Sequence, residues 1–335
     1  MIVIIPAWPK PLIRLKNQQR SKGPKQLHCV EKILGQDAYH TQCLPIHISC
    51  LMELKKTNQI FTLAHKLVER YPEGVVCALQ IAWYAVGCYY LLINKRDSAR
   101  RYLSKATSLD KVFGPAWLMY GHSFAVENEH DQAMSAYFKA SLLMKGCHLP
   151  LLYIGLEYGL NNNPKLAEKF LSQALSLAPK DPFVLHELGV VSFHSGDYLA
   201  ARRLFLQALD HVSATCPGYS QLPEKWEPLL NNLGHTERKL KNYEKALEYH
   251  KLSLVLSPLN PATLSAIGYV YTLQKQWSKA VDTFHKVCST SQCGESAAHT
   301  LLQALGIQKD DAFSTTMLGH AIENLIAVDF PCTKD

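Results

Sequence analysis

The fold of this chain is decided by four similar stretches: WYAVGCYY at 83–90, WLMYGHSF at 117–124, LLYIGLEY at 151–158 and LHELGVVS at 185–192. Each stretch has glycine at its fifth position, and successive glycines lie 34 residues apart. Related glycines follow at 234, 268 and 319, at intervals of 45, 34 and 51 residues. A fixed period of this length indicates a repeat protein, in which each unit buries its apolar face only by stacking on its neighbours.

The period and its residues resemble the tetratricopeptide repeat, a helix–turn–helix unit of 34 residues. In that pattern glycine at position 8 and alanine at positions 20 and 27 allow the two helices to approach closely. Large residues at positions 4, 11 and 24 are expected to fill the space between adjacent units. One unit shows the pattern clearly, with Trp117, Gly121, Phe124, Ala133 and Tyr137. We therefore predict an all-α fold, a right-handed superhelix (α-solenoid) of about seven units.

Departures from the period predict how the chain is organised. We expect a basic, disordered head at 1–36, a degenerate repeat and irregular connection at 37–79, repeats at 80–210, a long loop at 211–226, repeats at 227–286, an insertion that interrupts a helix at 287–303, the end of a repeat with a last helix at 304–326, and a tail at 327–335. About five extra residues also precede Trp83.

The net charge of +7 is concentrated in the head. Residues 1–36 contain seven Lys or Arg and one Glu, so the rest of the chain carries only +1. The repeat region therefore offers no basic stripe for phosphates, and we expect no nucleic-acid partner. The uncharged stretch 74–94 is a candidate membrane span by hydropathy. Because it contains the first helix of a repeat, we predict a buried helix and no membrane contact.

The ten cysteines show no C-x-x-C pair and no zinc-site spacing with histidine. Their scattered positions favour reduced, buried thiols and a location in the nucleus and cytoplasm. The sequence contains no G-x-x-x-x-G-K-[ST], G-x-S-x-G or H-E-x-x-H motif. We therefore expect no catalytic residues, no cofactor and no metal.

Repeat superhelices bind peptides along a concave face that is lined mainly by the first helix of each unit. Positions 2, 5, 9, 12 and 13 of the repeat face that groove, and here they are apolar in the early units and polar in the later ones. Such a gradient suits an amphipathic peptide, with asparagine meeting its backbone and Arg238 an acidic side chain. Ordinary packing or solvation is the alternative. The predicted groove residues are Tyr84, Leu118, His122, Leu152, Leu156, His186, Asn231, Asn232, His235, Arg238, Tyr269 and His320.

Several strings go beyond the generic repeat: CLPIHISCLMELKKTNQ at 43–59, the stretch from YGHSF to LNNN at 120–163, KWEPLLNNLGH at 225–235 and DDAFSTTMLGHAIE at 310–323. Over residues 37–326 the chain resembles the family of cell division cycle protein 16 homologues, subunit 6 of the anaphase-promoting complex. The resemblance covers the C-terminal repeats, and neither the head nor the interruption at 287–303 fits it. We therefore expect a truncated or alternatively spliced form.

The resemblance implies a non-catalytic scaffold in a ubiquitin ligase that marks mitotic regulators for degradation. It implies a superhelix that encloses the N-terminal segment of a small partner, cell division cycle protein 26, and stacks on neighbouring repeat subunits. The family forms homodimers through N-terminal repeats, which this chain lacks. Spindle or centrosome association also follows from the resemblance.

Two other functions remain open from the residues. A cochaperone adaptor would clamp a peptide C-terminus with Lys and Asn at positions 5, 9 and 13, where the early units here are apolar. An enzyme with a fused repeat domain, such as a glycosyltransferase, would need a catalytic domain. No segment outside the repeats is long enough to form one.

Overall fold

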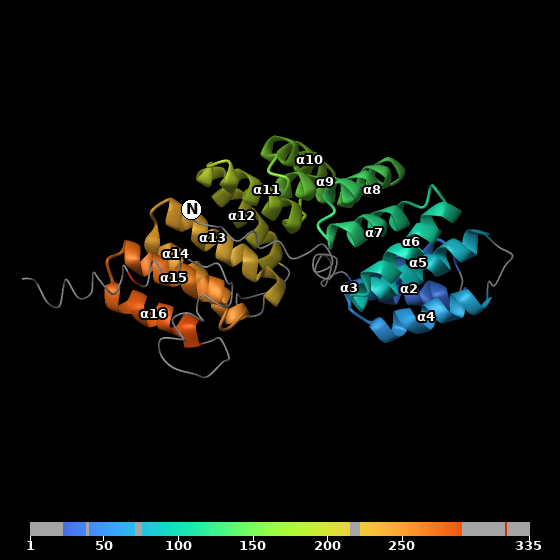
Figure 1. Ribbon diagram of the computed structural model, residues 1–335, viewed down its shortest axis with the longest axis horizontal. Helices are drawn as coiled ribbons and strands as arrows, with labels where there is room; N and C mark the ends of the chain where they lie inside the picture. The colour runs from blue at the N-terminus through green and yellow to red at the C-terminus, as the bar shows by residue number, and fades with distance from the viewer. Residues whose placement is uncertain (1–22, 38–39, 71–75, 215–221, 290–318, 320–335) are drawn as a thin grey trace, which may run out of the picture. The chain divides into compact units, whose positions relative to one another are not determined.

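The computed structural model describes residues 23–37, 40–70, 76–214, 222–289 and 319, and in these ranges it consists of helices joined by short turns (Figure 1). They divide into two compact units, with the boundary between Val191 and Ser192. The helices are α2 Gly23–Gln36, α3 Cys43–Glu53, α4 Thr57–Arg70, α5 Val76–Leu92, α6 Arg96–Leu109, α7 Gly114–Ala125, α8 His130–Leu143, α9 Leu149–Leu160, α10 Pro164–Leu177, α11 Pro182–His194, α12 Tyr198–Ser213, η2 Glu224–Trp226, α13 Glu227–Lys239, α14 Tyr243–Leu256, α15 Pro261–Leu273 and α16 Trp277–Ser289.

Helices α3 to α16 form seven consecutive pairs within the described ranges, which confirms the predicted all-α tetratricopeptide-repeat fold. The two helices of a pair pack on each other, as α5 does on α6 and α13 on α14. The second helix of one pair also packs on the first helix of the next pair. Helix α6 packs on α7 in this way in the compact unit that ends at Val191, and α14 packs on α15 in the compact unit that begins at Ser192. This stacking gives each pair an apolar surface on both sides.

Small residues allow the close approach of paired helices, as the sequence predicts. A Cβ atom added to Gly87 would lie 2.6 Å from Cγ of Leu103, and one added to Gly268 would lie 2.8 Å from the ring of Phe284. The alanines at position 20 of six successive pairs are fully buried: Ala99, Ala133, Ala167, Ala201, Ala246 and Ala280. At these crossings any larger side chain would separate the helices.

The aromatic residues at positions 4 and 11 of the first helix stack on aromatic rings of the second helix in the same pair. The rings of Trp83 and Tyr90 in α5 both stack on Tyr102 of α6, with centroids 5.4 and 5.3 Å apart. In the same way Tyr158 of α9 stacks on Phe170 of α10 at 5.5 Å. These rings therefore pack on the other helix of their own pair, a contact that the prediction did not include.

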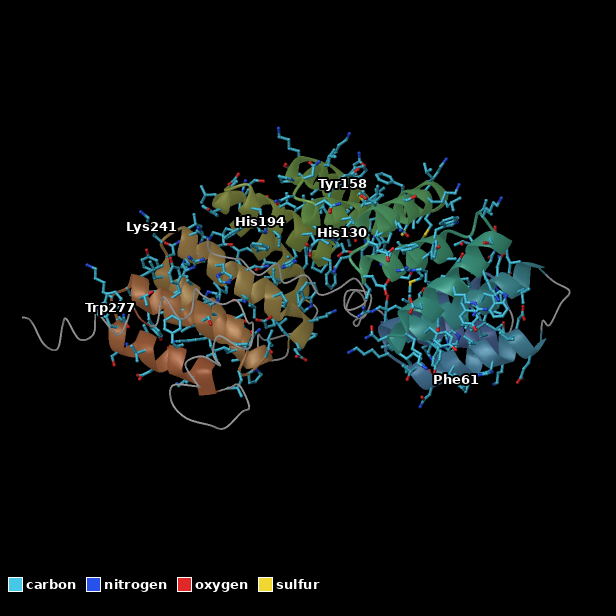
Figure 2. The ribbon with its side chains drawn as sticks, in the orientation of Figure 1. Phe61, His130, Tyr158, His194, Lys241 and Trp277 are labelled. Carbon is cyan, nitrogen blue, oxygen red and sulfur yellow. The ribbon has the colours of Figure 1, made fainter. Side chains whose placement is uncertain are left out.

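The turn inside each pair uses one residue in the left-handed region. Asn94, Asn128 and Asn162 have φ values of 63°, 62° and 58°, and Lys241 and Lys275 have values of 65° and 59°. Asparagine tolerates this conformation better than lysine does. Figure 2 shows Lys241 at the turn between α13 and α14.

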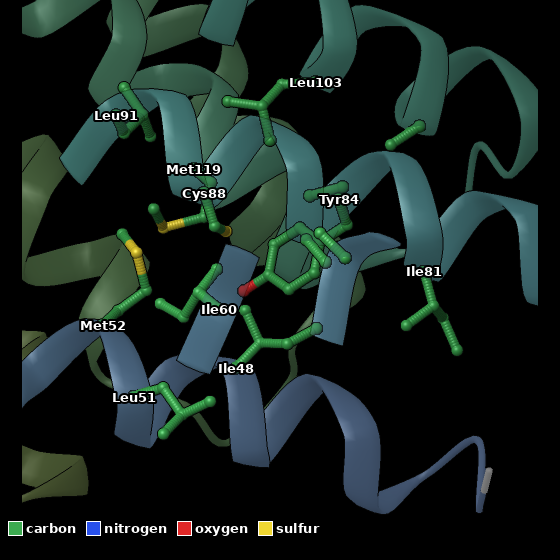
Figure 3. Packing of buried hydrophobic residues seen from close by; sticks show 14 of the residues in the cluster. Ile48, Leu51, Met52, Ile60, Ile81, Tyr84, Cys88, Leu91, Leu103 and Met119 are labelled. Atoms are coloured by element: carbon green, nitrogen blue, oxygen red, sulfur yellow. The ribbon is translucent and has the colours of Figure 1, made fainter. Parts of the chain in front are cut away.

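The compact unit that ends at Val191 contains an apolar cluster that joins five helices, α3 to α7 (Figure 3). Ile48 and Leu51 of α3, Ile60 of α4, Tyr84 of α5 and Leu103 of α6 are all almost completely buried. The cluster explains why the uncharged stretch around Trp83 is apolar without being a membrane segment. Among the described residues, no helix has the length and hydropathy needed to cross a membrane.

The structure differs from the predicted organisation in three places. Residues 23–36 of the predicted head form α2, which packs on α3 because Val30 and Leu34 share one face. The extra residues before Trp83 lengthen α5 to 17 residues, against 12 in α7. Helix α12 extends to Ser213, into the loop predicted at 211–226.

Helix α16 ends at Ser289, three residues into the insertion predicted at 287–303. Residues 290–303, the tail at 327–335 and, except for residue 319, the last helix predicted at 304–326 lie outside the described residues.

Candidate partner-binding site

The first helix of each pair carries the predicted groove residues. Positions 5 and 9 are four residues apart, so they lie one turn apart on the same face of the helix. Eleven of the twelve predicted residues lie in the described part of the chain, on α5, α7, α9, α11, α13 and α15. His320 lies outside the described residues.

In the unit that ends at Val191, the predicted groove residues are packed side chains. Six residues are each 7% exposed or less: Tyr84, Leu118, His122, Leu152, Leu156 and His186. Tyr84 contacts the ring of Phe113 edge-on at 5.2 Å and belongs to the apolar cluster of this unit. The early half of the predicted groove therefore offers little free surface in this structure, and its contact with a peptide stays a prediction.

His122 on α7 is completely buried among aromatic rings. Its Nδ1 lies 2.7 Å from the hydroxyl of Tyr137, and its ring centroid lies 4.4 Å from that of Tyr153. Burial lowers the pKa of His122 to about 3, so the imidazole is neutral at physiological pH. His122 thus links α7, α8 and α9, which is a packing role.

In the unit that begins at Ser192, polar residues come together on α13. Asn231, His235 and Arg238 follow at intervals of four and three residues, so they share one face. Asn232 lies on the same helix and is buried. The guanidinium of Arg238 lies over the ring of Tyr269 on α15, 4.9 Å from its centroid. The structure therefore brings together four of the predicted residues: Asn231, His235, Arg238 and Tyr269.

His250 on α14 completes this cluster, although it is absent from the predicted set. Its Nδ1–H donates to Oδ1 of Asn231 over 2.8 Å, and its ring centroid lies 4.9 Å from that of His235. His250 occupies position 24, where other pairs carry Leu103, Tyr137, Leu171 or Phe284. The signal in the sequence was a polar residue at a position that the repeat reserves for a large apolar one.

Burial decides the charges of this cluster. It lowers the pKa of His235 to about 3, with a further contribution from the positive charge of Arg238. Burial also lowers the pKa of His250 well below its usual value, assisted by His235 and Arg238. Both imidazoles are therefore neutral at physiological pH, and Arg238 carries the positive charge of the cluster.

The helices that carry the cluster are held together by the buried carboxylate of Glu227, at the start of α13. Oε1 of Glu227 accepts hydrogen bonds from the hydroxyls of Ser253 and Thr263 over 2.5 and 3.0 Å, and from the amide of Asn260 over 3.2 Å. These donors belong to α14, to α15 and to the turn between them. One carboxylate therefore ties three helices together.

Within the described ranges, no group of three His, Cys, Asp or Glu side chains is placed to hold a metal ion.

Comparison with known proteins gives consistent matches. Tetratricopeptide-repeat family profiles match residues 81–113 and 229–257. The human cell division cycle protein 16 homolog is 56% identical over 88% of this chain and 44% of its own length. Anaphase-promoting complex subunit 6 of Arabidopsis thaliana is 44% identical over 73% of this chain and 43% of its own length. The chain thus spans less than half of these curated relatives.

A solved structure, the crystal structure of the APC/C hetero-tetramer Cut9-Hcn1, superposes with a TM-score of 0.77. Its sequence identity is 34%, and the match covers 90% of this chain and 53% of that chain. These matches confirm the resemblance found in the sequence. The chain is therefore a tetratricopeptide-repeat protein homologous to part of the cell division cycle protein 16 (anaphase-promoting complex subunit 6) proteins.

Proposed function

We propose that the chain is a non-catalytic scaffold component of the anaphase-promoting complex, working in the nucleus and cytoplasm. The observation that carries this proposal is the 56% identity to the human homologue over 88% of the chain. In this role the chain would support ubiquitin-dependent degradation of mitotic regulators by holding other subunits in place.

We further propose that the first-helix face binds the N-terminal segment of a small partner, cell division cycle protein 26, and that the pairs stack on neighbouring repeat subunits. Cut9 and Hcn1 crystallised together as a hetero-tetramer, which supports a heteromeric assembly for this chain as well. The polar cluster on α13 supports a peptide partner, since Asn231 is only partly buried and its amide keeps N–H groups that a peptide carbonyl can accept from while its Oδ1 is bonded to His250.

Copurification tests the assembly. The chain is expressed with an affinity tag in human cells, and the bound proteins are identified by mass spectrometry. We expect subunits of the anaphase-promoting complex. Recovery of chaperones without those subunits would favour the adaptor that binds peptide C-termini, and recovery of neither would contradict the scaffold proposal.

Peptide titration tests the partner. A fluorescent peptide with the N-terminal sequence of cell division cycle protein 26 is titrated with the purified chain, beside a peptide of the same composition in scrambled order. Saturable binding of the native order alone is the expected result. Equal binding of both peptides would contradict a specific peptide site.

A further inference from the structure

Two of the three guanidinium nitrogens of Arg238 are buried without a hydrogen-bond partner. The residue is 5% exposed, and its Nε and one terminal nitrogen are out of contact with solvent and unbonded. Its described contact is the face of the Tyr269 ring. Burying a charged group without partners costs several kcal/mol, so a protein keeps such a group where something outside the free chain compensates for it.

Among the described residues, no carboxylate lies within 4.0 Å of Arg238 to serve as a counter-ion. The adjacent Glu237 is already used, since its Oε1 lies 2.7 Å from Nε of Arg202 and its Oε2 accepts from Asn242 over 2.8 Å. Burial lowers the pKa of Arg238, and the groups that oppose this shift are the phenols of Tyr269, Tyr198 and Tyr243. Phenols are uncharged at neutral pH, so the positive charge stays uncompensated.

Two further polar atoms of the cluster are also buried without partners, Nδ1 of His235 and Nε2 of His250. His235 precedes Arg238 by three residues on the same face of α13, and the His250 ring lies against Gly234 of that helix. Nδ1 of His250 donates to Asn231, and Nε2 of His250 lies 2.6 Å from the position of a Cβ atom added to Gly234, so helix α13 itself covers this nitrogen. The guanidinium of Arg238 and the unbonded Nδ1 of His235 thus share one face of α13.

We propose that Arg238, His235 and Tyr269 form a binding site for the acidic side chain of an Asp or Glu residue in a bound peptide. This inference rests on the proposal that the first-helix face binds a peptide, and it names the chemistry of that contact. The single positive charge of the binding site matches a carboxylate, whereas a phosphate dianion would leave one charge unpaired.

Stability of the free chain gives the first test. We expect Arg238→Met to raise the thermal midpoint, because it removes a buried charge that has no partner. The matched control, Arg202→Met, breaks the pair with Glu237 and should lower the midpoint. A fall of similar size in both variants, with helicity retained, would show that Arg238 is a structural residue and would overturn the binding site.

Binding gives the second test, with three fluorescent alanine-rich probes of equal length. One carries a single Glu and blocked ends, one carries Gln instead, and one carries Gln with a free C-terminal carboxylate. We expect the Glu probe to bind the wild-type chain roughly tenfold more tightly than the Gln probe, and Arg238→Met to remove the difference. Equal binding of the Glu and Gln probes, or stronger binding of the probe with the free C-terminus, would overturn the proposal.

These probes separate the two proposals from each other. If the peptide of cell division cycle protein 26 fails to bind while the Glu and Gln probes differ, the partner proposal fails and the binding site for an acidic side chain stands. If that peptide binds, each acidic residue in it is changed to its amide, and the peptides are titrated into wild-type and Arg238→Met chains. At least one change should weaken binding to the wild-type chain alone, and equal losses in both chains would overturn the binding site.

Discussion

Gly234 of α13 lies directly against the imidazole of His250 on α14, so that a Cβ atom at Gly234 would be 2.5 Å from Cε1 of His250. This contact places the histidine under the face that carries His235 and Arg238. It also sets the ring so that its Nδ1 reaches Asn231. The close approach of the two helices, which the repeat needs for packing, is therefore also what builds the polar cluster.

The first prediction concerns that contact. Gly234→Ala forces either the ring or the helix to move, and overpacking of this kind costs about 1–3 kcal/mol of unfolding free energy. Gly35 on α2 is the matched control, because a Cβ atom there meets nothing within 4 Å and alanine is the better helix former. Chemical denaturation should show a loss for Gly234→Ala and none for Gly35→Ala. A neutral Gly234→Ala variant would mean that α13 and α14 can separate freely.

The second prediction concerns the turns. Lys241 has φ of 65°, where asparagine occurs at the same place in other pairs, as at Asn128 with φ of 62°. Left-handed backbone costs roughly 1–2 kcal/mol for an ordinary residue, and less for asparagine. Lys241→Asn should therefore raise the unfolding free energy by several tenths of a kcal/mol, up to about 1 kcal/mol. The reverse change, Asn128→Lys, should lower it, and the urea midpoints of the two variants should move in opposite directions.

The glycines at a 34-residue spacing predicted the helix pairs, because a glycine at a helix crossing is required by geometry and recurs with the unit. The shared face of Asn231, His235 and Arg238 also followed from spacing alone. The packed state of Tyr84 and His122 did not, because burial depends on side chains from neighbouring helices that are distant in the sequence.

His250 was absent from the predicted groove residues for a related reason. It lies on a second helix, whereas the pattern assigns the groove to first helices. Its role depends on how closely Gly234 allows it to approach. The α2 helix at 23–36 was missed because the basic composition of the head concealed the apolar face of Val30 and Leu34.

The third prediction concerns the carboxylate that ties three helices. Glu227→Ala leaves the hydroxyls of Ser253 and Thr263 without their acceptor in a buried place, which costs about 1–3 kcal/mol for each unsatisfied group. Ser253→Ala removes only one donor and should cost about 1 kcal/mol. Guanidinium denaturation should rank the variants in that order. A Glu227→Ala chain as stable as Ser253→Ala would show that the other two bonds add nothing.

The last prediction concerns the asparagines on α13. The double change Asn231→Ala with Asn232→Ala should weaken binding of the cell division cycle protein 26 peptide while helicity stays intact. Asn231 holds His250 in place through its Oδ1, so its loss frees the ring as well as removing a polar contact. Lys245→Ala, at an exposed position on α14, is the control and should bind as the wild-type chain does.

Titration calorimetry measures both affinities, and circular dichroism measures the helicity of each variant. Asn231→Ala alone should account for most of the loss, because Asn232 is buried and Asn231 is the partner of His250. We expect roughly a tenfold weaker affinity, which corresponds to about 1.4 kcal/mol. An unchanged affinity in the double variant would exclude α13 from the peptide site, since the hydrogen bonds of both asparagine side chains would have been removed without effect.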